Sequence, residues 1–108
     1  MPAESALMVV TTPPLFRLGI LLATPGALEF IQTNDIDIQA LVHRHVSGDD
    51  GDLCAEDKAA NKSALKHGSR IFSSYRCVDG VSDGDGGRLW IITEADRAST
   101  TVLLPSEY

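Results

Sequence analysis

Cysteine and long hydrophobic runs are both scarce in this 108-residue chain. Cys54 and Cys77 are the two cysteines, and neither forms the closely spaced Cys or His pairs that zinc sites use. The longest apolar run, residues 18–23, is far shorter than the roughly 20 residues of a membrane span. The first residues also lack the basic and apolar regions of an export signal. We therefore expect a cytoplasmic protein with free thiols and without a membrane segment.

Basic charge is scarce as well. Nine Lys and Arg stand against fifteen Asp and Glu, which leaves a net charge of −6, and the chain has no basic arm. Such a chain lacks the electrostatic footprint of a nucleic-acid binder, so we expect no direct nucleic-acid binding. An acidic protein suits a partner with a basic surface, including a protein that normally holds nucleic acid.

Sequence motifs of known catalytic sites are missing from the chain. It contains no glycine-rich phosphate loop, no GxSxG nucleophile elbow and no HExxH pair. His43 and His45 stand two apart on an expected helix, so they point to different sides and cannot share a metal ion there. We expect no cofactor and no resident metal, and an enzyme is the less favoured interpretation.

Acidic residues and glycines crowd the region between residues 47 and 57. The glycines favour a compact turn, and Asp52 is a candidate N-cap for the helix that follows. The carboxylates could instead hold a hard cation, although their spacing is not that of an EF-hand. The residues concerned are Asp49, Asp50, Asp52 and Glu56. A metal-binding regulator therefore stays open as an alternative.

Three short helices are expected in the first two thirds of the chain. Thr24 and Pro25 mark the start of the first, as N-cap and first helical residue. Asp35 or Asp37 caps the second. The acidic loop leads into the third, which ends at Gly68.

Strand patterns follow these helices. Residues 69–78 alternate between two faces, residues 88–94 form the strongest strand, and residues 100–104 form another. Residues 79–87, rich in Gly and Asp, predict a mobile hairpin loop. A short apolar segment at residues 15–23 predicts one more strand near the N-terminus.

These patterns predict an α+β fold. An N-terminal strand and two to three short helices would pack on a C-terminal three- to four-stranded antiparallel sheet. Residues 1–14 are expected to be a flexible tail, and residues 15–108 a single domain.

Polar side chains of the predicted sheet suggest an enzymatic alternative. They could converge as in small RNA-cleaving toxins, where a base accepts the proton of the 2′-hydroxyl and an arginine steadies the phosphate. The candidates are Arg70, Tyr75, Glu94, Arg97 and Thr100. The same residue types are also ordinary on a solvated strand face.

Several segments resemble a known family. They are HVSGDDGDL with AEDKAAN, then SRIFSSY and RLWIITEADRASTTVLLPSEY, together with LATPGALE near the first helix. They resemble uncharacterised "plasmid-related proteins" of proteobacterial plasmids and integrated elements, in which an aromatic residue commonly stands at the position of Asp50. The resemblance implies no reaction. It implies a mobile-element context, in which small acidic proteins such as anti-CRISPR proteins counter host defences.

We therefore predict a non-enzymatic interaction protein that acts through its acidic surface on a host protein, as an anti-CRISPR-like inhibitor would. For the single tryptophan, burial in the core is the simpler interpretation, and a partner-facing anchor is the other. The predicted partner-binding residues are Asp49, Asp50, Asp52, Glu56, Asp83, Asp85, Trp90 and Glu94. The oligomeric state is not predicted, and a homodimer is left open.

Overall fold

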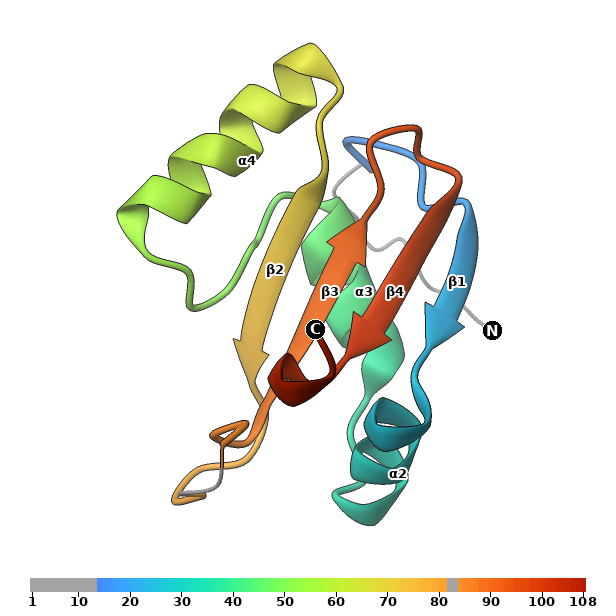
Figure 1. Cartoon of the computed structure of the whole chain (residues 1–108), viewed down its shortest axis with the longest axis vertical. Coiled ribbons are helices and arrows are strands. Elements are labelled where there is room, and N and C mark those ends of the chain that lie inside the picture. Colours follow the sequence, from blue (N-terminus) through green and yellow to red (C-terminus); the bar gives the residue numbers. More distant parts are fainter. Residues whose placement is uncertain (1–13, 82–83) are drawn as a thin grey trace, which may run out of the picture.

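The computed structural model describes residues 14–81 and 84–108, and these residues form the predicted α+β fold (Figure 1). The predicted tail over residues 1–14 lies outside the described residues except for Pro14, and Asp83 lies outside them too. In chain order the elements are β1 (Ile20–Ala23), α2 (Pro25–Thr33), α3 (Ile38–Val46), α4 (Ala55–His67), β2 (Ile71–Arg76), β3 (Arg88–Thr93), β4 (Ser99–Leu103) and the 3-10 helix η1 (Pro105–Glu107).

The four strands form one sheet in the order β1-β4-β3-β2. The last three strands make the predicted antiparallel meander, whereas β1 joins the sheet parallel to β4. β1 is shorter than the predicted strand over residues 15–23 because the chain turns at Gly19, which has a φ of 65°. A Cβ at this glycine would lie 2.3 Å from the carbonyl group of Ala98, so the close approach requires glycine.

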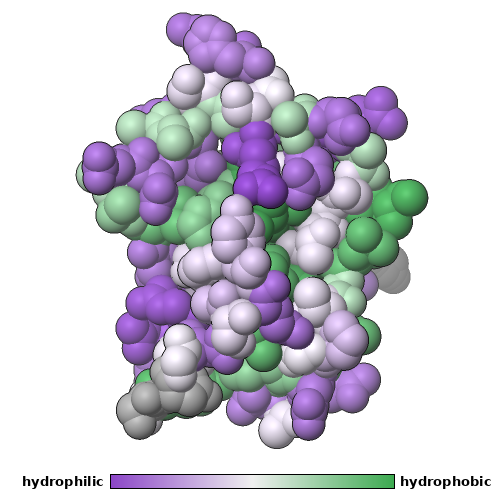
Figure 2. Space-filling model, in the orientation of Figure 1, coloured by the Kyte–Doolittle hydropathy of each residue, from purple (hydrophilic) through white to green (hydrophobic). Residues whose placement is uncertain are grey.

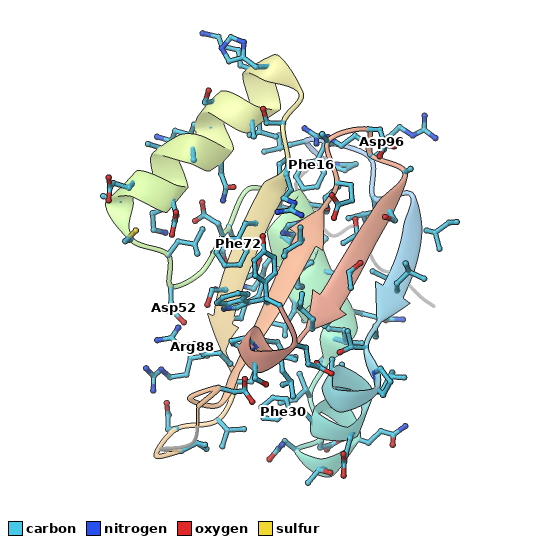
Figure 3. All side chains as sticks on the ribbon, in the orientation of Figure 1. Phe16, Phe30, Asp52, Phe72, Arg88 and Asp96 are labelled. Atoms are coloured by element: carbon cyan, nitrogen blue, oxygen red, sulfur yellow. The ribbon has the colours of Figure 1, made fainter. Side chains whose placement is uncertain are left out.

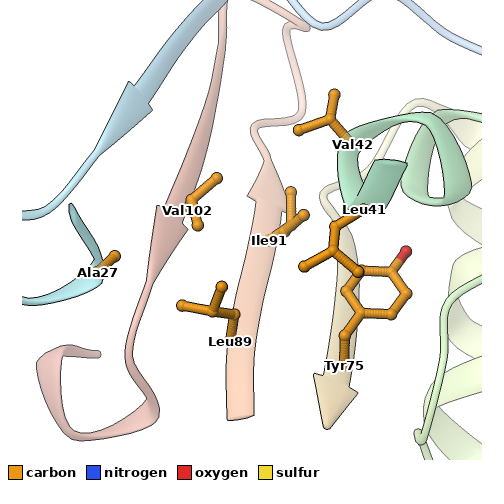
Figure 4. Packing of buried hydrophobic residues seen from close by; sticks show 7 residues of the cluster. All are labelled: Ala27, Leu41, Val42, Tyr75, Leu89, Ile91 and Val102. Carbon is orange, nitrogen blue, oxygen red and sulfur yellow. The ribbon is translucent and has the colours of Figure 1, made fainter. Parts of the chain in front are cut away.

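Two of the helices, α2 and α3, cover one face of the sheet, and the opposite face is turned to the viewer in Figure 1. The core lies between the sheet and these helices (Figure 4). Its buried cluster consists of Ala27, Leu41, Val42, Tyr75, Leu89, Ile91 and Val102. The strand residues of this cluster point to the helical side, as expected from two-residue alternation.

The start of α2 is tied to the C-terminal turn. Thr24 caps the helix as predicted, because its hydroxyl oxygen accepts from the N–H of Ala27 at 3.2 Å. The same hydroxyl donates to the carboxylate of Glu107 at 2.5 Å, and Glu107 also accepts from the N–H of Gly26 at 3.2 Å. The hydrogen bond from Thr24 is the main cause that lowers the pKa of Glu107. A residue of η1 therefore closes the first turn of α2.

Replacing Thr24 by Ala is expected to lower the free energy of unfolding by about 1 kcal/mol, the usual cost of losing an N-cap. Thr24→Ser is the matched control, since serine keeps the hydroxyl that caps the helix and bonds Glu107. Urea unfolding followed by circular dichroism measures both variants. Equal losses in the two variants would contradict the capping role.

Asp37 rather than Asp35 caps α3. Its carboxylate accepts from the N–H of Ala40 at 3.2 Å. Asp35 instead adopts a left-handed φ of 53° in the turn between α2 and α3. Asp tolerates this conformation better than most residues. Asp35 is therefore the turn residue, and Asp37 is the N-cap.

The prediction that Asp52 caps α4 is wrong. The N-cap is Cys54, which makes no side-chain capping bond. The carboxylate of Asp52 turns to the end of the sheet instead, where it accepts from the N–H of Arg76 at 2.9 Å and from the guanidinium of Arg88 at 3.3 Å. Figure 3 shows Asp52 and Arg88 close together there. The helix ends at Gly68 in a left-handed φ of 77°, as predicted.

Candidate functional site

The predicted acidic surface is engaged within the chain. The carboxylate of Asp49 lies 2.7 Å from the Arg44 guanidinium, and this hydrogen bond lowers the pKa of Asp49. Asp50 accepts from the Lys58 ammonium at 2.9 Å and from the Asn61 amide at 3.1 Å, and its side chain is 16% exposed. Together with Asp52, these carboxylates already have cationic or N–H partners that a binding protein would have to displace.

The same loop and a residue of α4 cover the outer edge of β2. The side chain of Asn61 accepts from the N–H of Phe72 at 3.0 Å and donates to its carbonyl at 2.6 Å. Two residues further along β2, the N–H of Ser74 donates to the carbonyl of Asp50 at 3.1 Å, and its carbonyl accepts from the N–H of Asp52 at 2.7 Å. The backbone groups that an edge strand would offer to another strand are therefore occupied.

The other predicted acidic residues lie apart from this loop. Glu56 lies exposed in the first turn of α4. Asp85 accepts from the N–H of Ser106 at 2.7 Å and so joins the β2–β3 connection to η1. Glu94 lies 3.5 Å from the guanidinium of Arg70 on the open face of the sheet. The structure thus does not gather the predicted carboxylates into one patch.

An aromatic groove occupies the open face of the sheet. It has a volume of about 240 Å³ and is lined by Arg70, Phe72, Trp90, Ile92 and Tyr108. The Trp90 ring lies 4.9 Å from the ring of Phe72 and 5.7 Å from that of Tyr108, both in edge-on arrangements. Phe72 is labelled in Figure 3, and Figure 2 shows the same face in space-filling form. Of the two interpretations of Trp90, burial in the core is wrong, because Trp90 is half-buried on the face that α2 and α3 leave uncovered.

A charged rim borders this aromatic groove. The guanidinium of Arg70 donates to the phenol oxygen of Tyr108 at 2.8 Å and lies 5.7 Å from the centre of its ring. On its other side Arg70 meets Glu94, and both side chains are nearly half exposed, at 47% and 44%. Tyr108 is 69% exposed. The groove therefore offers apolar rings, one cation and one anion within a small area.

The residues of the predicted RNA-cleaving site do not converge. Tyr75 and Thr100 are 1% and 0% exposed on the helical side of the sheet, opposite the face that carries Arg70. The Arg97 guanidinium bonds backbone carbonyls, among them that of Ala64 at 3.3 Å, and so joins the β3–β4 turn to α4. The side chain of Glu94 meets Arg70, and its backbone carbonyl accepts from the Arg97 guanidinium at 3.0 Å, but Tyr75 and Thr100 lie on the other face of the sheet.

A buried polar network was not foreseen from the sequence. His45 lies between two hydroxyl groups, with Nδ1 at 2.6 Å from Ser73 Oγ and Nε2 at 2.8 Å from Thr93 Oγ1. Thr93 lies 2.7 Å from Thr100, which donates to the carbonyl of Leu18 at 2.8 Å. The inward positions of these polar residues on alternating strands are the sequence signal that could have revealed it.

The end of this network determines the direction of every hydrogen bond. Because Thr100 donates to the Leu18 carbonyl, its oxygen accepts from Thr93. Thr93 then accepts from Nε2–H of His45, which leaves Nδ1 to accept from the Ser73 hydroxyl. Burial lowers the pKa of His45 from 6.5 to about 4, so the ring is neutral at pH 7.

The network joins α3 to the sheet. A cavity of about 290 Å³ lies beside it, under α4 and next to Phe16 and Ile71. His45 and Ser73 are among the residues that line this cavity, although each is only 1% exposed and each already has a hydrogen-bond partner in the network. We interpret the network as a packing device that holds one orientation of α3.

In residues 14–81 and 84–108, no group of three or more His, Cys, Asp or Glu side chains is placed to hold a metal ion. No helix among these residues is both long and apolar enough to cross a membrane.

Comparison of the chain with protein-family models, with curated proteins and with solved structures returned no match. The resemblance to plasmid-related proteins therefore stays a prediction.

Proposed function

We propose that this chain is a non-enzymatic interaction protein that binds a partner protein through the open face of its sheet. The observation that supports this most directly is the aromatic groove around Trp90. Trp, Tyr and Arg are the residues most enriched among binding hot spots, and here Trp90, Tyr108 and Arg70 line a single groove. Each ring keeps part of its surface in water, so a partner could gain affinity by covering it.

The charge of the chain indicates a partner with a basic surface. A net charge of −6 attracts a cationic protein during approach, within a screening length of about 8 Å at physiological salt. At the groove, Glu94 can pair with a Lys or Arg of the partner while an apolar side chain enters between the rings. This retains Trp90 and Glu94 from the predicted contact residues.

The acidic loop has a smaller part in this proposal than the sequence predicts. Asp49 and Asp50 would have to give up Arg44 and Lys58 before they could pair with a partner. We propose that the loop contributes to the overall negative field, and that direct contacts are made at the groove. The mobile-element resemblance leads us to propose a host defence protein as the partner, inhibited by occupation of its basic surface.

Trp90→Ala is expected to weaken binding at least 30-fold, as loss of a central aromatic anchor does. A host protein recovered on the immobilised chain would be purified and titrated by calorimetry against the wild type and variants. Asp49→Asn is the matched control, and it should change affinity by less than about threefold. Circular dichroism would confirm that both variants are folded.

Two results would refute the proposal. One is a Trp90→Ala variant that binds the purified partner as tightly as the wild type does. The other is binding of single-stranded RNA that depends on Trp90, because exposed aromatic rings on a sheet also stack on bases. The RNA would be titrated by fluorescence anisotropy at 50 and 200 mM salt.

A further inference from the structure

The two edge strands of the sheet, β2 and β1, differ in whether their outward backbone groups are hydrogen-bonded. Along β2, every second residue has its outward backbone groups bonded by Asn61 or by the acidic loop. At the opposite edge, residues 14–81 and 84–108 place no strand, loop or side-chain cap along the outer side of β1. The outer edge of β2 is thus bonded by Asn61 and the acidic loop, whereas no residue of the described ranges covers the outer edge of β1.

The uncovered edge is apolar on both faces. Ile20, Leu21 and Leu22 are 67%, 51% and 48% exposed, which is high for consecutive large aliphatic residues. Edge strands usually carry a lysine, a proline or a bulge that prevents pairing, and β1 has none of these. In Figure 2 the margin where Figure 1 places β1 is green, the colour of hydrophobic residues.

The hydrogen bonds to β4 show which backbone groups of β1 point outward. The N–H of Ile20 donates to the carbonyl of Ala98 at 2.9 Å, and that of Thr24 donates to Val102 at 3.0 Å. Even-numbered residues of β1 therefore turn their N–H and C=O groups toward β4. Leu21 and Ala23, which alternate with them, direct theirs away from the sheet.

We propose that the chain forms a two-fold symmetric dimer in which β1 pairs antiparallel with β1 of a second copy. With Leu22 facing Leu22 of the second copy, Leu21 pairs with the second copy's Ala23, and Ala23 with its Leu21. Both pairs use outward N–H and C=O groups, so four hydrogen bonds form between the copies. A two-fold axis at Leu21 would instead require Gly19 as a strand residue, which its φ of 65° prevents. The product is one continuous eight-stranded sheet.

Charge favours a second copy as the occupant of this edge. β1 carries no charged residue, so two chains of net charge −6 can meet there with little direct repulsion. A basic partner would find no carboxylate on β1 itself.

Disulfide trapping tests the dimer and its register. In a variant with Cys54→Ser and Cys77→Ala, a further Leu22→Cys substitution is expected to yield a covalent dimer on mild oxidation. Directly opposed, non-hydrogen-bonded residues have Cα atoms about 4.5 Å apart, within the range of a disulfide. Ile20→Cys, which faces Thr24 of the second copy, and Leu65→Cys on α4 are the controls. Equal cross-linking of Leu22→Cys and Leu65→Cys would refute the pairing.

Sedimentation equilibrium on the full chain supplies the second test. The wild type is expected to be a dimer at tens of micromolar, and Leu22→Lys a folded monomer, since it opposes two lysines on the axis. Leu65→Lys, at a leucine 40% exposed on α4, should stay dimeric. A monomeric wild type would overturn the proposal and leave β1 to another occupant. Trp90→Ala should leave the dimer intact, so this test is independent of partner binding.

Discussion

Lowering the pH from 7 to 4 is expected to remove about 3 kcal/mol of the free energy of unfolding through His45 alone. Burial places the pKa of this residue at about 4 in the folded protein, against 6.5 for an ordinary histidine. Between these two values the unfolded chain binds a proton that the folded chain does not. Stability is therefore fully present above pH 6.5 and falls as the pH drops toward 4.

The hydrogen-bond directions explain why the folded protein resists this proton. Nδ1 of His45 is already an acceptor for the Ser73 hydroxyl, and Nε2–H is directed at Thr93. A protonated ring would carry a buried charge, and the attraction of Asp50 does not offset the loss of solvation. The free energy needed to bury the protonated His45 ring equals the stability that the protein loses at low pH.

Urea unfolding at pH 7, 5.5 and 4.5 would measure the effect in the wild type and in His45→Gln. Glutamine keeps one donor and one acceptor but does not titrate, so its stability should change much less over this range. Asp49, whose pKa lies below the ordinary 3.8, loses its stabilising pair only at lower pH. Parallel pH profiles for the two proteins would show that His45 is not responsible.

Replacing Asn61 by Ala is expected to cost about 3 kcal/mol, because one side chain makes three hydrogen bonds at the β2 edge. Its amide nitrogen donates to the carbonyl of Phe72 at 2.6 Å and to Asp50 at 3.1 Å, and its oxygen accepts from the N–H of Phe72 at 3.0 Å. Asn61 is 8% exposed, so the groups left behind would be shielded from water. The change also frees the backbone N–H and C=O of Phe72 at this edge for pairing between molecules.

Guanidinium unfolding and light scattering would test both parts of this expectation. Lys62→Ala is the matched control, since it shortens the next residue of α4, whose side chain makes none of these bonds. Asn61→Ala should unfold at lower denaturant and form larger species at high protein concentration, whereas the control should do neither. A difference of less than about 1 kcal/mol between the two would refute the edge-covering role.

Much of the architecture could be predicted from local sequence patterns. The N-cap at Thr24 and the stop at Gly68 act within one turn of a helix, and the alternation along β2 acts within one strand. Such signals depend on residues that are near in sequence, so they can be recognised without knowledge of the fold. The α+β class and the antiparallel meander follow from them.

The candidate site was predicted only in part, because it depends on contacts between distant segments. Trp90 and Glu94 were predicted as contact residues and Arg70 as a catalytic candidate, but Phe72 and Tyr108 join them only when β2, β3 and the C-terminus come together. A local pattern cannot show which face of a strand the helices leave open. Trp90 lies on that open face, where it is half-buried in the aromatic groove and not part of the core.

By itself, the sequence determined the fold class, the net charge and the ends of most elements. The tertiary structure decided how the carboxylates are used: Asp50 meets Lys58 and Asn61, and Asp52 meets Arg88 across 36 residues. It also made β1 parallel to β4, buried His45 among hydroxyl groups and, within residues 14–81 and 84–108, left the outer edge of β1 uncovered. The physical reason is that the environment of a charge or a strand edge depends on residues that only the folded chain brings near.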